Sequence, residues 1–265
     1  MPRERDEYIA GFIDGDGCIS MPRPSEKNRK PEPNVSISQA YDHRNPPELR
    51  YARRHYGGKI YKLSRRFETR RQQWSLQYTS RKDRLRILKV IARHSIVKRA
   101  EAELALDYIR NGKPDAERTH AAILAAKIDR QNAKIDMSRV TPSYIAGLFA
   151  AEGSVCLMWN GRSAFQITAC IAQKCCVSVL EAIKTKLGFG VIGARSCLQF
   201  SSGPISRKFL KFIKPYMKKS QKKPQVRQAL KLHRIHRRRP GYKRSEKEIE
   251  ELKAAVQKLK DMKRK

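Results

Sequence analysis

Short stretches of alternating apolar and polar residues recur along the chain, and this pattern predicts β-strands. In QWSLQYT, residues 73–79, the apolar Trp74, Leu76 and Tyr78 fall on one face and the polar residues on the other. NVSIS at 34–38 and FQITAC at 165–170 alternate in the same way. A sheet with one apolar face has to cover that face with helices, so its polar face is left to water or a ligand.

Between the strands, apolar residues recur at helical spacing. The expected covering helices are Pro47–Tyr56, Arg81–His94 and Ser95–Arg110 in the first half, and about Lys174–Leu187, Ser206–Met217 and Gln225–Arg237 in the second. In SEKEIEELKAAVQKLKDMK, residues 245–263, apolar residues such as Leu252 and Val256 have the same spacing. We expect this segment to be an amphipathic helix that packs on the second half.

A ten-residue motif occurs twice, as YIAGFIDGDG at 8–17 and as YIAGLFAAEG at 144–153. The elements after each copy follow the same order: two strands, a helix, two strands and a helix. We therefore expect an α+β fold of two pseudo-symmetric αββαββα halves, each an antiparallel sheet saddle covered by helices. The halves would span 1–110 and 142–240, with a helical linker region at 111–141 and a C-terminal amphipathic helix at 241–265.

Small residues recur inside both motif copies, at Ala10 and Gly11 and again at Ala146 and Gly147. Glycine in the middle of a helix costs about 1 kcal/mol unless something compensates. Close packing of the two motif helices against one another would supply that compensation. The halves are therefore expected to pack through these two helices.

Both motif helices carry sequence signals at their ends. Asp6 can cap the first helix, and Thr141 followed by Pro142 can begin the second. Gly17 and Gly153 fit the left-handed position that often ends a helix.

The chain is strongly basic, with 59 Lys and Arg against 25 Asp and Glu and a formal net charge of +34. Such an excess favours a polyanionic partner, most often nucleic acid. The stretch 182–245 contains no Asp or Glu, which favours phosphate binding over a mixed-charge face. An anionic membrane is the rival partner, but no apolar run approaches the roughly 20 residues that span a bilayer. The N-terminus lacks the apolar stretch of a secretory signal, whereas a cleaved organellar transit peptide stays open.

The cysteines indicate neither a zinc site nor a disulfide framework. None forms a CxxC pair, and the six His residues lack zinc-finger spacing. Reduced and partly buried thiols suit an intracellular protein. The six cysteines are Cys18, Cys156, Cys170, Cys175, Cys176 and Cys197.

The candidate chemistry lies at the ends of the motif helices. Asp16 and Glu152 are the acids that persist in both copies, whereas Asp14 is replaced by Ala150. Packing the helices together brings the two acids to neighbouring C-termini, where backbone carbonyls are exposed and the helix dipole is negative. Such oxygen groups repel one another unless a hard cation such as Mg²⁺ lies between them. Next to a phosphate-binding surface, such a metal would activate water and stabilise the leaving oxygen.

DGDG has two other interpretations. A single copy could be a turn with solvated carboxylates, but the repeat favours a functional pair. An EF-hand is excluded because Ile19 stands where that loop needs glycine and Ser25 where it needs glutamate.

IAGFIDGDG and IAGLFAAEG resemble the two motifs of the single-chain, double-motif LAGLIDADG homing endonucleases. The resemblance covers about residues 6–237, in motif sequence and in element order. It implies that Asp16 and Glu152, with the carbonyls of Gly15 and Ala151, bind divalent metal. Mg²⁺ is the expected ion; Mn²⁺ would substitute, and Ca²⁺ would bind without supporting cleavage. Ala150 departs from the usual acid at its position, so Asp14 is expected to be dispensable.

The resemblance also implies polar and basic residues around the metals. A glutamine at the end of the second strand of each half matches Gln39 and Gln173, and a lysine before the last repeat helix matches Lys98. The equivalent lysine of the second half lies in MKKSQKK and is Lys218, Lys219 or Lys222, of which Lys219 is the expected one. Each of these residues could instead contact phosphate or be solvated.

A saddle formed by the two sheets would fit the DNA major groove, whose base edges carry a unique donor and acceptor code. The residues expected to contact DNA in the first half are Asn34, Ser36, Ser38, Arg65, Arg66, Arg70, Arg71, Gln73, Ser75 and Gln77. Those expected in the second half are Met158, Asn160, Arg162, Gln166, Thr168, Arg195, Gln199 and Ser201. The hairpin arginines could bind guanine or phosphate.

The resemblance implies a site-specific enzyme that hydrolyses both strands of a long, asymmetric double-stranded DNA site. It would leave short 3′ overhangs and promote intron mobility. The alternative is a non-cleaving intron-RNA-binding maturase or DNA-binding regulator of the same fold, which typically has eroded acids. A basic ribosomal or architectural protein would not explain the paired motifs. We expect a monomer without membrane or obligate protein partner, acting at DNA in a chloroplast, a mitochondrion or a prokaryotic cytoplasm.

Overall fold

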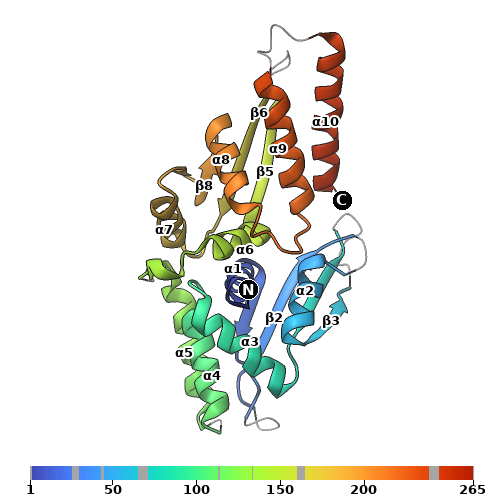
Figure 1. Cartoon of the computed structure of the whole chain (residues 1–265). Helices are drawn as coiled ribbons and strands as arrows, with labels where there is room; N and C mark the ends of the chain where they lie inside the picture. Colours follow the sequence, from blue (N-terminus) through green and yellow to red (C-terminus); the bar gives the residue numbers. More distant parts are fainter. Residues whose placement is uncertain are drawn as a thin grey trace.

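Two helices, α1 and α6, lie side by side at the centre of the computed structural model, with one α+β half on either side of them (Figure 1). The structure describes residues 2–25, 30–42, 45–64, 71–112, 114–132, 134–159, 165–238 and 245–264.

The elements of the two halves follow the same order along the chain. Those of the first half are α1 (Pro2–Asp16), β1 (Gly17–Ser20), β2 (Asn34–Ala40), α2 (Pro47–Tyr56), β3 (Lys59–Lys62), β4 (Gln73–Gln77), α3 (Arg81–His94) and α4 (Arg99–Arg110). Next come α5 (Ala116–Asp129) and two short 3₁₀ helices, Arg130–Asn132 and Met137–Arg139. Those of the second half are α6 (Pro142–Glu152), β5 (Gly153–Trp159), β6 (Phe165–Ala172), α7 (Val177–Leu187), β7 (Val191–Gly193), β8 (Cys197–Phe200), α8 (Gly203–Ile213) and α9 (Lys223–Arg238). The last helix is α10 (Glu246–Arg264).

Each half contains one antiparallel four-stranded sheet. The strand orders are β1-β2-β4-β3 and β5-β6-β8-β7, so the two sheets have the same topology. Ile37 pairs with Leu76, and Ile171 pairs with Leu198; all four side chains are buried on the face that the helices cover. The predicted α+β fold of two similar halves is therefore confirmed.

The interface between the halves depends on two glycines. A Cβ at Gly11 of α1 would overlap the carbonyl oxygen of Tyr144, and one at Gly147 of α6 would overlap that of Tyr8. The two helix backbones are therefore in direct contact, and neither glycine leaves room for a side chain. The surrounding residues of both helices, such as Phe12, are fully buried.

Some predicted helix ends differ from the observed ones. Helix α1 begins at Pro2, so Asp6 is not its cap and instead accepts a hydrogen bond from the Tyr56 hydroxyl at 2.6 Å. Thr141 does cap α6, accepting from the Tyr144 backbone amide at 3.2 Å, and Pro142 follows as predicted. Residues 95–98 form a turn, and α4 begins only at Arg99.

The prediction of left-handed glycines after the motif helices was wrong. Gly153 has the extended angles φ −76° and ψ 153°, and Gly17 is the first residue of β1 without a positive φ. Each helix passes directly into a strand. A Cβ at Gly17 would lie 2.7 Å from the Ile13 carbonyl oxygen, so the close return of the chain explains the glycine.

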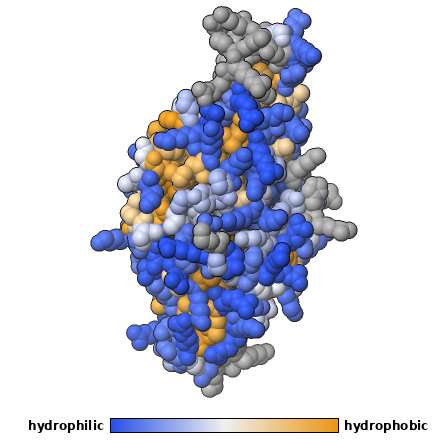
Figure 2. Space-filling model, viewed as in Figure 1, coloured by the Kyte–Doolittle hydropathy of each residue, from blue (hydrophilic) through white to orange (hydrophobic). Residues whose placement is uncertain are grey.

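Three further segments complete the fold. Helix α5 packs on α4 through the buried Ile123, and Arg130 forms an ion pair with Glu101. Helix α10 packs on α9 with Leu252 and Val256 buried, which is the face that the sequence pattern predicts. Among the described helices, none is long and apolar enough to cross a membrane. No disulfide joins the cysteines, and hydrophilic residues cover most of the face seen in Figure 2.

We predict that Gly147→Ala lowers the free energy of unfolding by about 3 kcal/mol, because the added methyl group overlaps a backbone carbonyl that cannot move independently. Urea denaturation measures the loss. Gly203→Ala is the matched control, since no heavy atom lies within 4 Å of its added Cβ. Equal stability of the two variants would show that the helices do not pack in this way.

Candidate active site

The ends of α1 and α6 bring the two motif acids together. A Cβ at Gly15, the neighbour of Asp16, would overlap the Cβ of Ala151 and lie 2.9 Å from Cγ of Glu152. Both acids are half-buried. Because each acid is the last residue of its helix, the pair lies where the two helices present their free carbonyl groups.

The groups around Asp16 shift its pKa in opposite directions. Burial raises the pKa of Asp16 to about 6; Lys222 lowers it, and the negative charge of Glu152 raises it. Gln39 lowers it by hydrogen bonding, with its Nε2 donating to Asp16 Oδ2 at 3.3 Å. The carboxylates therefore repel one another in a partly buried site, as expected where a cation binds.

Two lysines hold equivalent positions in the two halves. Lys98 Nζ donates to the carbonyl oxygens of Ile13 at 2.8 Å and Asp14 at 2.5 Å, at the end of α1. Lys222 Nζ donates to those of Phe149 at 3.3 Å and Ala151 at 2.6 Å, at the end of α6.

These lysines stabilise the negative ends of the motif helices. Burial lowers the pKa of Lys98 and of Lys222, and the nearest carboxylates, Asp14 and Asp16 respectively, raise it in part.

Lys222, rather than the expected Lys219, is thus the counterpart of Lys98. The side chain of Lys219 is exposed, whereas Lys222 reaches back to α6. The sequence leaves Lys218, Lys219 and Lys222 as candidates, and only the path of the turn before α9 decides between them.

The two predicted glutamines lie close to the helix ends but are buried, each 4% exposed. Gln39 contacts Asp16, whereas Gln173 Nε2 donates to the Asp14 carbonyl oxygen at 3.5 Å. Gln173 Oε1 in turn accepts a hydrogen bond from Cys175 Sγ at 3.1 Å. Their positions at the strand ends place them beside the acids, on the same face as the core.

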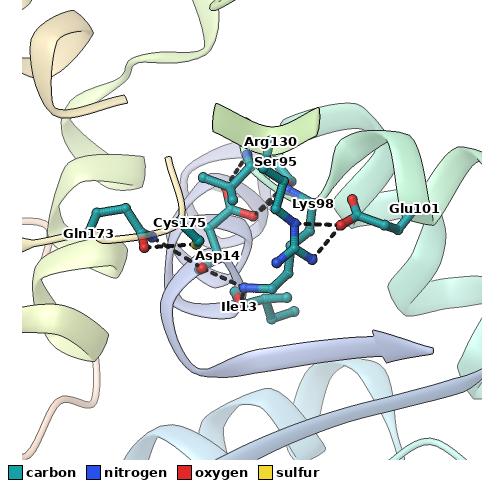
Figure 3. A network of polar contacts seen from close by, with 9 residues as sticks. Ile13, Asp14, Ser95, Lys98, Glu101, Arg130, Gln173 and Cys175 are labelled. Carbon is teal, nitrogen blue, oxygen red and sulfur yellow. Dashed lines mark hydrogen bonds and ion pairs between the residues drawn. The ribbon is translucent and has the colours of Figure 1, made fainter. Parts of the chain in front are cut away.

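Asp14 is buried and extensively hydrogen-bonded, surroundings that the comparison with Ala150 does not predict. It is 1% exposed, and it anchors the turn that precedes α4 (Figure 3). Its carboxylate accepts from Ser95 Oγ at 2.5 Å and from the Tyr144 hydroxyl at 2.7 Å. It also accepts from the backbone amides of residues 96, 97 and 98, at 2.9, 3.0 and 3.1 Å. Asp14 thereby fixes the backbone that carries Lys98.

Glu48 of α2 is a buried acid that the sequence reasoning missed. It is fully buried, and its Oε1 accepts from the Gln221 backbone amide at 2.8 Å, next to Lys222. Burial raises the pKa of Glu48 to about 7, although the Gln221 amide, the Ser220 hydroxyl and Lys222 each lower it. In the sequence Glu48 looks like an ordinary acid in the first turn of α2. Only its contact with the turn before Lys222 shows that it belongs to this site.

A cleft of about 530 Å³ opens beside this site and is lined by both halves. Tyr41 and Arg71 of the first half face Gly153, Ser154 and Lys222 of the second across it. The cleft gives solvent access to the end of α6.

The residues at the helix ends fit a divalent metal by their chemistry. Asp16, Glu152 and the carbonyl groups of Gly15 and Ala151 are all oxygen donors, which hard cations such as Mg²⁺ prefer. Among the described residues, no group of three or more His, Cys, Asp or Glu side chains could hold a metal. A metal here would therefore use two carboxylates, carbonyls and water or phosphate oxygens.

The predicted DNA-reading residues lie mostly on the sheet faces opposite the core. In the first half Ser38 pairs with Ser75, and Ser36 with Gln77; Asn34 and Gln73 are exposed, whereas Ser75 is buried. Lys59 and Tyr61 pair with Gln77 and Ser75 and so lie on the same face, which the alternation in KIYK could have indicated.

In the second half Gln166, Gln199 and Arg195 are exposed, while Thr168 and Ser201 are half-buried. Gln166 donates a hydrogen bond to the Ser201 carbonyl oxygen. Arg71 forms an ion pair with Asp42 at 3.2 Å. Five of the residues predicted to contact DNA lie outside the described residues, namely Arg65, Arg66, Arg70, Asn160 and Arg162. The side chain of Met158 lies outside them as well.

We predict that Asp14→Ala lowers the free energy of unfolding by about 3 kcal/mol, because it leaves several buried donors without an acceptor. Chemical denaturation measures this loss. The control is Glu103→Ala, which removes an exposed ion pair with Arg99 and should cost at most about 0.5 kcal/mol. A loss for Asp14→Ala no larger than the control would contradict its role as an anchor.

We predict a pH-dependent stability difference between the wild type and Glu48→Gln. The pKa of Glu48 rises from its ordinary 4.5 to about 7 on folding, so the folded state binds the proton more tightly. Wild-type stability from this group should then be lost as pH rises from about 4.5 to 7, by up to about 3 kcal/mol. The stability of the variant relative to the wild type should therefore increase between pH 4.5 and about pH 7, as measured by thermal denaturation at a series of pH values. A pH-independent difference would contradict the raised pKa.

Comparison with solved structures identifies the fold. The structure of the I-SmaMI LAGLIDADG homing endonuclease bound to cleaved DNA superimposes with a TM-score of 0.74 at 16% identity, covering 94% of this chain and 95% of that chain. I-SmaMI bound to uncleaved DNA with calcium ions gives 0.72 at 15% identity, covering 94% and 97%. The LAGLIDADG homing endonuclease I-GzeII in complex with its DNA target gives 0.70 at 13% identity, covering 94% and 96%.

At these identities the likeness shows a shared fold over nearly the whole length of both proteins. No model of a known protein family matches the chain, and no curated protein matches it in sequence.

Proposed function

We propose that this chain is a site-specific DNA endonuclease that hydrolyses both strands of a long double-stranded target with a divalent metal. The observation that carries the proposal is the arrangement of two acids at the ends of interlocked helices, each helix end contacted by a lysine. Two related sets of groups, one from each half, suit a reaction that occurs once on each strand. The fold shared with DNA-bound homing endonucleases supports the same conclusion.

Asp16 and Glu152, with the carbonyls of Gly15 and Ala151, would hold the metal, for which we propose Mg²⁺. When bound, the ion supplies a Lewis acid that activates water and stabilises a leaving oxygen. A neighbour crystallised with calcium and uncleaved DNA supports a divalent ion, and we expect Ca²⁺ to bind here without supporting cleavage and Mn²⁺ to replace Mg²⁺.

The chain's own residues would position the reaction. Lys98 and Lys222 provide positive charge next to the acids, where the phosphate of each strand would lie. Gln39 holds the carboxylate of Asp16 in place through Oδ2, leaving Oδ1 for a ligand. The cleft lined by Arg71 and Lys222 supports the approach of a phosphate to this end of the pair.

The polar faces of the two sheets would read the target in the major groove. Exposed side chains such as Asn34, Gln73, Gln166 and Gln199 can exchange hydrogen bonds with base edges. The basic excess of the chain would provide phosphate contacts and the greater part of the affinity. Because one chain carries both halves, we propose that a monomer binds an asymmetric site and that cleavage with short 3′ overhangs promotes intron mobility.

A non-cleaving RNA-binding maturase or DNA-binding regulator of this fold is less well supported. Such a protein has no use for two carboxylates that repel one another in a partly buried site, yet both are retained. Neutral residues would serve a purely structural role without the free-energy cost of desolvating two charges.

We predict that the wild type with Mg²⁺ cleaves the uninterrupted form of the gene that carries its intron. Asp16→Asn and Glu152→Gln should each lower the single-turnover rate by roughly 100-fold or more, because each removes a carboxylate from the metal. Gel analysis of labelled duplex measures the rate, and filter binding checks that DNA affinity is retained.

Lys219→Ala is the control, since Lys219 is exposed and should change the rate little. Cleavage that survives both acid substitutions would overturn the assignment of the ligands. A wild type that binds this DNA without cutting it would favour the regulator.

A further inference from the structure

The two active-site lysines are carried by similar turns. Lys98 follows a turn in which its own backbone amide donates to Ser95 Oγ at 3.0 Å. The Lys222 amide likewise donates to Ser220 Oγ at 3.1 Å. Both serines are buried, so each lysine is held by a compact and solvent-excluded turn rather than by a surface loop.

The first turn is anchored by a carboxylate from its own half. Asp14 accepts hydrogen bonds from Ser95 and from three successive backbone amides of the turn, the last of which belongs to Lys98. The second half has no such group at the equivalent position, because Ala150 replaces the acid. The turn before Lys222 therefore needs an anchor from elsewhere.

Glu48 occupies that place, although it belongs to α2 of the first half. Its Oε1 accepts from the Gln221 amide at 2.8 Å, and the Ser220 hydroxyl lowers its pKa, which shows that the serine is close. Glu48 is fully buried, and its charge also raises the pKa of Lys222. The contact crosses from one half of the chain to the other over 173 residues of sequence.

The motif tyrosines support the same correspondence. Tyr144 of α6 donates its hydroxyl proton to Asp14 at 2.7 Å. Tyr8, its counterpart on α1, lies beside Glu48, whose charge raises the pKa of the tyrosine. Ser220, in the turn before Lys222, lowers the pKa of Tyr8 and that of Glu48, so both groups lie next to this turn.

We propose that Glu48 is a positioning residue for Lys222, supplied by the first half in place of the acid that Ala150 has replaced. This inference rests on the proposed endonuclease function, in which Lys222 acts at one of the two strands. In the described part of the chain Glu48 makes no hydrogen bond with Asp16 or Glu152, and its effect is transmitted through the Gln221 backbone and the Ser220 hydroxyl that accepts from the Lys222 amide.

Hydrogen exchange of the apo protein tests the anchor without DNA or metal. Glu48→Met keeps the side-chain volume but removes the acceptor, so the Gln221 amide should exchange roughly 10-fold faster or more. Glu48→Gln keeps an acceptor oxygen and should retain most of the protection. The turn at 95–98 is the internal reference and should not change. Unchanged exchange at Gln221 in Glu48→Met would overturn the proposal, whether or not the protein cleaves DNA.

Cleavage kinetics test the consequence for Lys222. Glu48→Met should lower the single-turnover rate at saturating enzyme roughly 10- to 100-fold while the Kd for DNA stays unchanged, and Glu48→Gln should restore most of the rate. In a Lys222→Ala background, Glu48→Met should have no further effect, because its action passes through that lysine. In a Lys98→Ala background its full effect should remain.

An effect of Glu48→Met that persists without Lys222 would refute the proposal, even for an enzyme that cleaves normally as wild type. If Glu48→Met does not fold, Glu48→Asp replaces it, because the shorter carboxylate cannot reach the Gln221 amide and should give the same pattern.

Discussion

Contact between the backbones of α1 and α6 is the constraint on which the rest of the molecule depends. Gly11 and Gly147 each lie against a carbonyl of the opposite helix, so the helices meet at a separation that no side chain permits. This separation brings Asp16 and Glu152 together, joins the two apolar cores and fixes the relation between the two sheets. Each glycine sacrifices about 1 kcal/mol of helix propensity, which is offset by the packing of fully buried neighbours such as Phe12 and Phe149.

Much of this could be predicted from the sequence because the signals are local. Alternation in strands such as QWSLQYT, helical spacing in α3 and α10, and the repeated motif all depend on residues close together in the chain. The architecture and the pairing of Asp16 with Glu152 followed from them. The helix ends were less reliable, since the left-handed glycine and the extended glycine after a helix have the same sequence signature.

The errors at the candidate site have a common cause, namely contacts between distant parts of the chain. Lys222 could not be told from Lys219 because the candidate lysines of MKKSQKK differ only in how the turn directs them. The comparison with Ala150 predicts a dispensable Asp14 only if equivalent positions have equivalent surroundings, which they do not. In the second half the turn before Lys222 is contacted by Glu48, a residue that belongs to no repeated pattern.

That exchange makes the two halves unequal as modules. The first half contains the lysine turn together with its carboxylate, whereas the second half carries the turn and leaves the carboxylate to its neighbour. A hybrid protein that joins the second half to a foreign first half must therefore import a buried acid at the position of Glu48 on α2. By the same reasoning, a symmetric dimer of two second halves would lack this carboxylate unless an acid replaced Ala150, so the asymmetry of the chain lies in its interior as well as in its sheet surfaces.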